Sequence, residues 1–186
     1  MVDDVPTKSA ALALADERDM MRQGYEFLDE KRMLLASEIL DQLRIYEERK
    51  KRFLESLREA RHALADAVER HGIDNLQVYP PRALEPATPE RSESTFLGVP
   101  MVAHDFEPKA GEHAFPPIDP SREADECMQA FAELLAPLAE LGATSSNLHR
   151  LAEEYRRTEK RARALENGVR PEVNDRLKSI NEHLQT

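Results

Sequence analysis

The sequence contains very little cysteine, tryptophan or glycine, and each scarcity excludes a class of protein. Its 186 residues include one cysteine, no tryptophan and six scattered glycines. The single thiol, Cys127, cannot form an internal disulfide, which fits a reducing compartment. The few glycines form no phosphate-binding loop, and the Gly-x-Ser-x-Gly, Cys-x-x-Cys and His-Glu-x-x-His motifs are absent. We therefore expect no catalytic, cofactor-binding or metal-binding residues, and no enzyme activity in this chain.

Basic residues are also in the minority. The chain has 26 Lys and Arg against 36 Asp and Glu, a formal net charge of −10. This balance argues against nucleic acid and anionic lipid as partners, because both are bound through clustered basic side chains. No uncharged apolar run approaches the length of a membrane span, and the opening Met-Val-Asp-Asp has none of the features of a secretory signal. We expect a cytoplasmic protein with no direct membrane insertion.

Proline divides the chain into three segments. Nine of the twelve prolines fall within residues 72–120, and only Pro6, Pro137 and Pro171 lie outside that range. Because proline breaks the interior of a helix, the flanks can be long helices and the middle cannot. The pattern predicts a helix over residues 1–71, a proline-rich segment over 72–120 and a second helix over 121–186, together forming one elongated domain.

The first flank carries an apolar stripe at helical spacing. Its steps of seven and four residues average about 3.6 residues per turn, close to a straight α-helix and slightly above a strict heptad. A stripe of this kind predicts one long helix that buries a single face. Its members are Leu14, Met21, Leu28, Leu35, Ile39, Tyr46, Phe53, Leu57, Leu64 and Val68.

The second flank has a comparable stripe. Asp119-Pro120-Ser121 provides a cap and first turn, with an acidic residue, Glu123, where it suits the helix dipole. Kinks are expected at Pro137 and Pro171, and propensity leaves open whether the helix continues through Pro171. The stripe consists of Cys127, Phe131, Leu134, Leu138, Leu141, Leu148, Leu151, Tyr155, Ala162, Leu165, Val169, Val173, Leu177, Ile180 and Leu184.

Two helices that are each apolar along one stripe must bury those stripes, and the segment between them is long enough to turn the chain around. The fold class expected is therefore all-α dominated, with two long helices in an antiparallel coiled coil. Within the middle segment, apolar residues around Gly98 predict a short β-hairpin over Ser94–Asp105. Gly72 is placed to end the first helix.

Three charged clusters suggest functional interpretations. The middle segment offers a weak set of metal ligands, namely His104, Asp105, Glu107 and His113. Loop residues of this kind are usually just solvated, so we expect no metal site there. The run 49–52, Arg-Lys-Lys-Arg, follows glutamates placed to neutralise it on the same helix, so a solvated helix face is expected there.

The third cluster, within residues 156–163, is the most informative. Arg156, Lys160 and Arg163 repeat at i, i+4 and i+7 and so share one helix face. Like charges on one face repel one another. Two interpretations stay open, namely screening by salt and by Glu159 or Glu166, and an interface with an acidic partner.

Several segments resemble a known family. Pro6-Thr7-Lys8, a leucine-bearing helix, Gly24 and the run 27–35, Phe-Leu-Asp-Glu-Lys-Arg-Met-Leu-Leu, look like the N-terminal helix of the D subunit of the vacuolar and archaeal-type rotary ATPases. Residues 157–167, Arg-Thr-Glu-Lys-Arg-Ala-Arg-Ala-Leu-Glu-Asn, followed by Pro171, resemble that family's C-terminal helix. Residues 96–100, Phe-Leu-Gly-Val-Pro, are similar to its central element. One departure is Ala162-Arg163, where the family commonly has Val-Asn.

The resemblance implies a rotor shaft in the central stalk of a V-type or A-type ATP synthase. Such a shaft transmits torque between a catalytic hexamer of A and B subunits and a membrane ring that moves H⁺ or Na⁺. It also binds the small F subunit of the stalk and rests on a funnel-like C or d subunit. The chain itself is then peripheral to the membrane, as part of a membrane-bound complex. Nucleotide is bound by the partners. On this basis the candidate interface residues are Lys31, Arg32, Arg156, Lys160, Arg161, Arg163, Glu166 and Pro171.

Other functions compete with this interpretation. A generic coiled-coil scaffold or tether would use the same apolar stripe to associate with other chains. The shaft of F-type enzymes is disfavoured, because its helices enclose a larger α/β domain that 49 proline-rich residues cannot supply.

Overall fold

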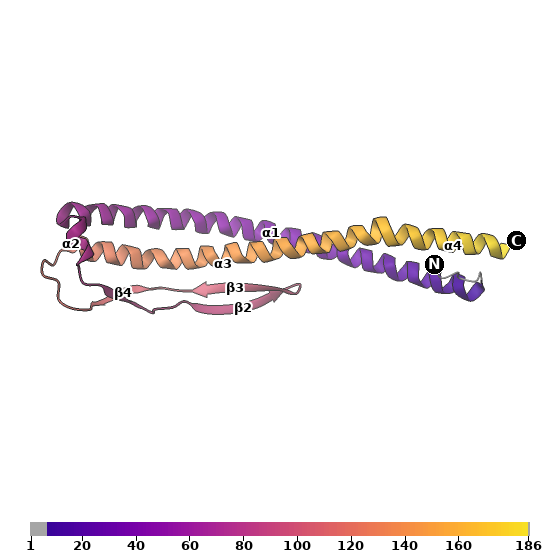
Figure 1. Ribbon diagram of the computed structural model, residues 1–186, viewed down its shortest axis with the longest axis horizontal. Helices are drawn as coiled ribbons and strands as arrows, with labels where there is room; N and C mark the ends of the chain where they lie inside the picture. Colours follow the sequence, from indigo (N-terminus) through magenta and orange to yellow (C-terminus); the bar gives the residue numbers. More distant parts are fainter. Residues whose placement is uncertain (1–6, 186) are drawn as a thin grey trace. The chain divides into compact units, whose positions relative to one another are not determined.

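The computed structural model describes residues 7–185 of the chain. Two long helical segments and a small β region make up the fold (Figure 1). The helical elements are α1 (Lys8–His71), α2 (Ile73–Gln77), α3 (Arg122–Ala164), the π-helix η1 (Leu165–Val169) and α4 (Arg170–Gln185). The strands are β1 (Arg82–Glu85), β2 (Glu90–Phe96), β3 (Val99–Asp105) and β4 (Lys109–His113). The mostly helical fold class expected from the sequence is confirmed.

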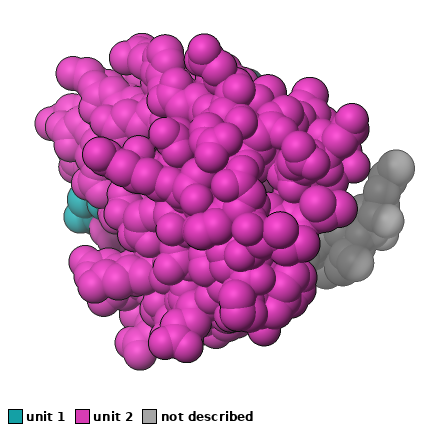
Figure 2. All heavy atoms as spheres, turned by 90° about the vertical axis from the view of Figure 1, so that its left-hand side faces the viewer, with its two compact units in different colours: residues 1–39, 151–186 teal, residues 40–150 magenta. Residues whose placement is uncertain are grey.

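The chain divides into two compact units. The terminal unit comprises residues 1–39 and 151–186, of which 7–39 and 151–185 are described, and the central unit comprises residues 40–150. Figure 2 shows one face of the central unit. Because α1 and α3 each cross the boundary between units in sequence, each unit contains a portion of both helices.

The paired helices run antiparallel within each unit. In the terminal unit Leu14 packs with Val173 and Ile180, whereas Lys31, farther along α1, meets Glu154, farther back on α3. In the central unit Arg49 contacts Glu140, and His71, farther along α1, contacts Ser121, which lies earlier in the chain than Glu140.

The apolar seam is narrow. The largest fully buried side chains of residues 7–185 are Leu35 and Leu151, together with two threonines, Thr144 and Thr158. Most of the stripe on α1 is buried or half-buried as expected, but Leu64 is exposed because Ala60 and Ala67 occupy the interface there.

The stripe on the second flank also differs in part from the expectation. Phe131 and Leu138 are both substantially exposed, and polar residues such as Asn147 take buried positions instead. Two other members of that stripe, Val169 and Leu184, have side chains outside those that the structure describes.

Local signals lie at both ends of α1 and at the start of α3, and those at Gly72 and Ser121 were expected from the sequence. The Thr7 hydroxyl accepts the Ala10 N–H at the start of α1. Gly72, at φ +75°, follows the last residue of α1 and takes the left-handed region that glycine tolerates best. The Ser121 hydroxyl accepts the Ala124 N–H at 3.1 Å and so caps α3.

The two prolines of the second flank lie in different surroundings. Helix α3 runs through Pro137 without interruption. Before Pro171 the chain forms η1 and then continues as α4, so the helical path passes through this proline. A π-turn holds one more residue than an α-turn, and such turns accommodate breaks in the regular hydrogen-bond ladder.

The β region consists of two nested antiparallel pairs, β2 with β3 and β1 with β4. The inner hairpin closes through Leu97 and Gly98, which both have positive φ, as a type I′ turn requires. The predicted hairpin is therefore confirmed, and its first strand begins earlier than predicted, at residue 90.

The seam makes a direct stability prediction at two neighbouring leucines. Leu35 is fully buried and Leu34 is 46% exposed on the same helix. Leu35→Ala should lower the free energy of unfolding by about 2–5 kcal/mol, because it removes buried methyl groups and leaves a cavity. Leu34→Ala should change it by only about 0.5 kcal/mol. Urea titration followed by circular dichroism measures both, and equal losses would contradict the seam.

Candidate partner-binding surfaces

The candidate interface residues all lie in the terminal unit. Two are on α1, four on α3, one in η1 and one in α4. The structure separates them into residues that serve contacts within the chain and residues that face solvent.

Lys31 belongs to the first group. Its Nζ lies 2.6 Å from Glu154 Oε1, and the two side chains are only 19% and 21% exposed. The position follows from the seam, since Lys31 comes three residues after Leu28 and four before Leu35, and therefore faces the partner helix. The ammonium group already holds the two helices together within the unit.

Arg32 lies beside this contact but pairs on its own helix. Its guanidinium pairs with Asp29, three residues earlier, and both side chains are about one-third exposed. The pair covers the edge of the seam and leaves part of the guanidinium in solvent.

The predicted basic face on α3 is exposed. Arg156, Lys160 and Arg163 are all exposed, and Arg163 pairs with Glu159 at 2.7 Å. Within residues 7–185, no ion pair engages Arg156 or Lys160. Glu159 therefore neutralises one of the three cations, Arg163, and the charges of Arg156 and Lys160 remain exposed to solvent.

The remaining candidates lie close by along the chain. Arg161, Glu166 and Pro171 are all exposed. Leu165, at the start of η1, faces Gly24 of α1, where an added Cβ would lie 3.8 Å from Leu165 Cδ1. The π-turn therefore begins where the helices pack and carries Glu166 into solvent.

Sequence reasoning missed an ionic cluster in the central unit. Arg49 and Arg52 of the basic run both reach Glu140 of α3, at 3.4 and 3.1 Å, instead of making the expected neutralising pairs along α1. Arg49 also donates to Thr144 Oγ1. The available signal was the position of Arg49, three residues after Tyr46 on the seam, which is the same offset as that of Lys31 from Leu28.

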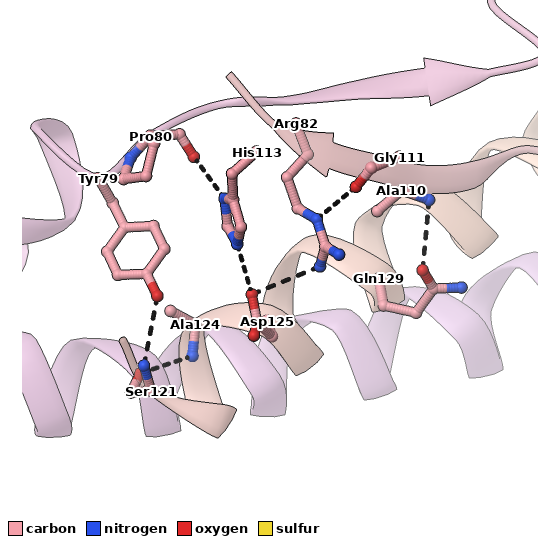
Figure 3. A network of polar contacts seen from close by, with 10 residues as sticks. All are labelled: Tyr79, Pro80, Arg82, Ala110, Gly111, His113, Ser121, Ala124, Asp125 and Gln129. Atoms are coloured by element: carbon pink, nitrogen blue, oxygen red, sulfur yellow. Dashed lines mark hydrogen bonds and ion pairs between the residues drawn. The ribbon is translucent and has the colours of Figure 1, made fainter. Parts of the chain in front are cut away.

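A second missed cluster anchors the base of the β region to α3 (Figure 3). Asp125 receives His113 Nε2 at 2.9 Å and an Arg82 Nη1 hydrogen bond at 3.4 Å. The Arg82 Nε–H also donates to the Gly111 carbonyl, across the β1–β4 pair. His113, one of the weak metal candidates, thus contacts a helix carboxylate rather than the other three.

The inner hairpin of the β region is held by amide and guanidinium contacts. Asn147 receives the Val102 N–H at Oδ1 and donates from Nδ2 to the Val102 carbonyl, both at 2.9 Å. The Arg150 Nε–H donates to the Pro100 carbonyl at 2.7 Å. These contacts bind β3 to α3.

The described residues offer no candidate metal centre or membrane span. No group of three or more His, Cys, Asp or Glu side chains within residues 7–185 lies close enough to hold a metal ion. Among the described helices, none has the length and apolar character needed to cross a bilayer. Burial raises the pKa of the Cys127 thiol, which favours the protonated and less reactive form.

An apolar patch surrounds the loops that connect α1 to α3. Ile73, Val78, Phe115 and Ile118 are each more than half exposed, and Ile118 is fully exposed. All but Ile73 line a hollow of about 250 Å³ that also includes Asp119. A cluster of large exposed apolar side chains is typical of a protein-binding surface.

Comparisons with known proteins agree in pointing to one family. The family model for the D subunit of ATP synthase matches residues 10–185. The V-type ATP synthase D subunit of Thermotoga neapolitana is 24% identical, over 97% of this chain and 89% of its own length. The A-type ATP synthase D subunit of Methanopyrus kandleri is 28% identical, over 97% of this chain and 79% of its own length. The A-type ATP synthase D subunit of Thermococcus kodakarensis is 27% identical, over 96% of this chain and 85% of its own length. The chain therefore belongs to the family of ATP synthase D subunits.

Proposed function

We propose that this chain is the central rotor shaft of a V-type or A-type rotary ATPase. The observation that carries the proposal is that both units are built on the same antiparallel pair of helices, held by a narrow seam and by ion pairs that cross it. Paired helices of this kind resist bending without a bulky core. Membership of the D subunit family supports the same role.

In this role the chain transmits torque and leaves nucleotide chemistry to its partners. The shaft turns inside a hexamer of A and B subunits, binds the small F subunit and rests on a funnel-like subunit that connects it to the membrane ring. Each nucleotide state of the hexamer favours one shaft angle through its differential contacts, so rotation is a sequence of population shifts.

The exposed cations of α3 suit contacts that must form and break at each step. Arg156 and Lys160 are solvated, and solvated ion pairs contribute only about 0–1 kcal/mol each. We assign the hexamer contact to the exposed candidates, namely Arg156, Lys160, Arg161, Arg163, Glu166 and Pro171. Lys31 and Arg32 instead make ion pairs within the terminal unit, with Glu154 and Asp29.

The apolar patch on the connecting loops suits the more permanent contact with the funnel-like subunit. Apolar burial is not directional and does not depend on the nucleotide state. Asp119 lines the hollow beside the patch, and the exposed Asp74 follows Ile73 in sequence, so the matching surface of the partner should be apolar with basic groups beside it.

The partner assignment is tested by reconstitution. The tagged chain should co-purify with the A and B subunits and the small F-like subunit when all are produced together. Light scattering on the isolated chain separates the competing scaffold function, because a scaffold would self-associate through the seam and a shaft would stay monomeric. Self-association without capture of A and B would reject the shaft.

The basic face yields a prediction about coupling. Replacing Arg156, Lys160 and Arg163 together with Ala should reduce ion transport per ATP hydrolysed in the reconstituted complex, because attractive contacts with the hexamer are lost. Helix content should be retained, since alanine is the best helix former. The matched control replaces three exposed cations of the central unit, Lys51, Arg58 and Arg61, with Ala. Unchanged coupling in the first variant would remove this assignment.

The apolar patch yields a separate prediction. The double variant Phe115→Ser with Ile118→Ser should lose capture of the funnel-like subunit while still co-purifying with A and B. The expected loss is about tenfold or more in affinity, since two large apolar side chains no longer leave water on binding. Leu54→Ser with Leu138→Ser, which changes two leucines that are each nearly half exposed, should leave that capture unchanged. Equal losses in both variants would contradict the assignment.

A further inference from the structure

A groove lies between the β2–β3 hairpin and α3, entirely within the central unit. Its volume is about 360 Å³, at the small end of the range of ligand sites. One wall is formed by Arg91 and His104 of the hairpin, and the other by Ser146 and Arg150 of α3. The Asn147 and Arg150 contacts to β3 fix the distance between the two walls.

Among the described residues, the groove is lined by basic groups and by no carboxylate. This is unusual in a chain with ten more acidic than basic residues. Glu93 pairs with Arg91 from a nearby position on the same strand, at 2.6 Å, but does not line the groove. Arg150 is held by neutral acceptors, the Pro100 carbonyl and Asn147 Oδ1, so its charge is not cancelled by these partners.

His104 adds a polar ring to the hairpin wall of the groove. Its Nδ1 is buried and has no hydrogen-bond partner among the described residues. Because this atom is closed to solvent, a bound ligand does not reach it, and recognition of a ligand falls to Arg91 and Arg150.

The residues at the floor of the groove, together with the positions of the cations, indicate which class of ligand fits. Ala139, Gly142 and Ala143 of α3 are small, so an extended chain can approach the helix closely. The cations stand on two opposite walls and do not converge on one point, and the α3 backbone N–H groups here are used within the helix. A phosphate site uses converging donors such as a loop of free N–H groups.

We propose that this groove binds a short acidic segment of a partner polypeptide, with carboxylates placed toward Arg91 and Arg150. The small floor accepts the backbone of that segment, and the two basic walls select its side chains. The inference rests on the geometry of the central unit alone, and it does not require the rotor function.

The test is an NMR titration of the full ¹⁵N-labelled chain at low salt. The probe is a blocked hexapeptide of alternating Glu and Ala, with the Gln–Ala hexapeptide and inorganic phosphate as separate arms. Saturable shifts should appear at the amides of Val102, Gly142 and Ala143 with the Glu peptide only. Shifts with phosphate alone would mark a free-anion site and overturn the polypeptide assignment, as would no shifts at all.

Two pairs of variants locate the binding. Arg91→Gln should weaken the Glu peptide by about two- to fivefold, the effect of one exposed ion pair, while Arg44→Gln, at an exposed arginine that also pairs with a nearby acid, should not. Ser146→Glu places a carboxylate in the groove and should weaken binding further, while Ser145→Glu, one residue outside its lining, should weaken it less. Equal effects within each pair would show non-specific attraction and overturn the proposal.

Discussion

The burial of a narrow apolar seam between two antiparallel helices is the constraint on which the rest of this structure depends. Each helix presents only one apolar stripe, so little apolar area is available on either helix to form the interface. Polar residues therefore also occupy buried positions in the interface. Thr144 and Thr158 are fully buried, as are Leu35 and Leu151. Ion pairs then act at the edges of the seam, where partial burial makes Lys31 with Glu154 more effective than a solvated pair.

The β region depends on α3 for a second reason. Two-stranded ribbons are marginally stable in water, and β2 is exposed over nearly its whole length. Val99 and Met101 of β3 are buried, and polar contacts add to this small apolar area. Asn147 satisfies both backbone groups of Val102, and Asp125 receives His113 and Arg82 at the base. The helix thereby fixes the ribbon through directional bonds, which also hold open the basic groove between them.

The surfaces differ in chemistry in a way that matches different kinds of contact. The exposed cations of the terminal unit suit binding that is weak and reversible, because charged groups there stay hydrated. The apolar patch on the connecting loops suits binding that lasts, because burying it releases water and this gain does not depend on precise orientation. The proposed shaft, which turns against one partner and moves with another, needs both kinds of surface.

Local signals in the sequence determined the helices, their ends and the central hairpin, whereas only the tertiary structure decided which charges meet. Gly72 and Ser121 act within one turn of their own position, and Gly98 requires only its neighbour to close the hairpin turn. By contrast, Lys31 and Glu154 are 123 residues apart in sequence, and Arg49 and Glu140 are 91 residues apart. No local pattern in the sequence can therefore predict that these residues meet. The path through Pro171 was equally undecidable from propensity, because a π-turn becomes favourable only when packing holds the helix in place.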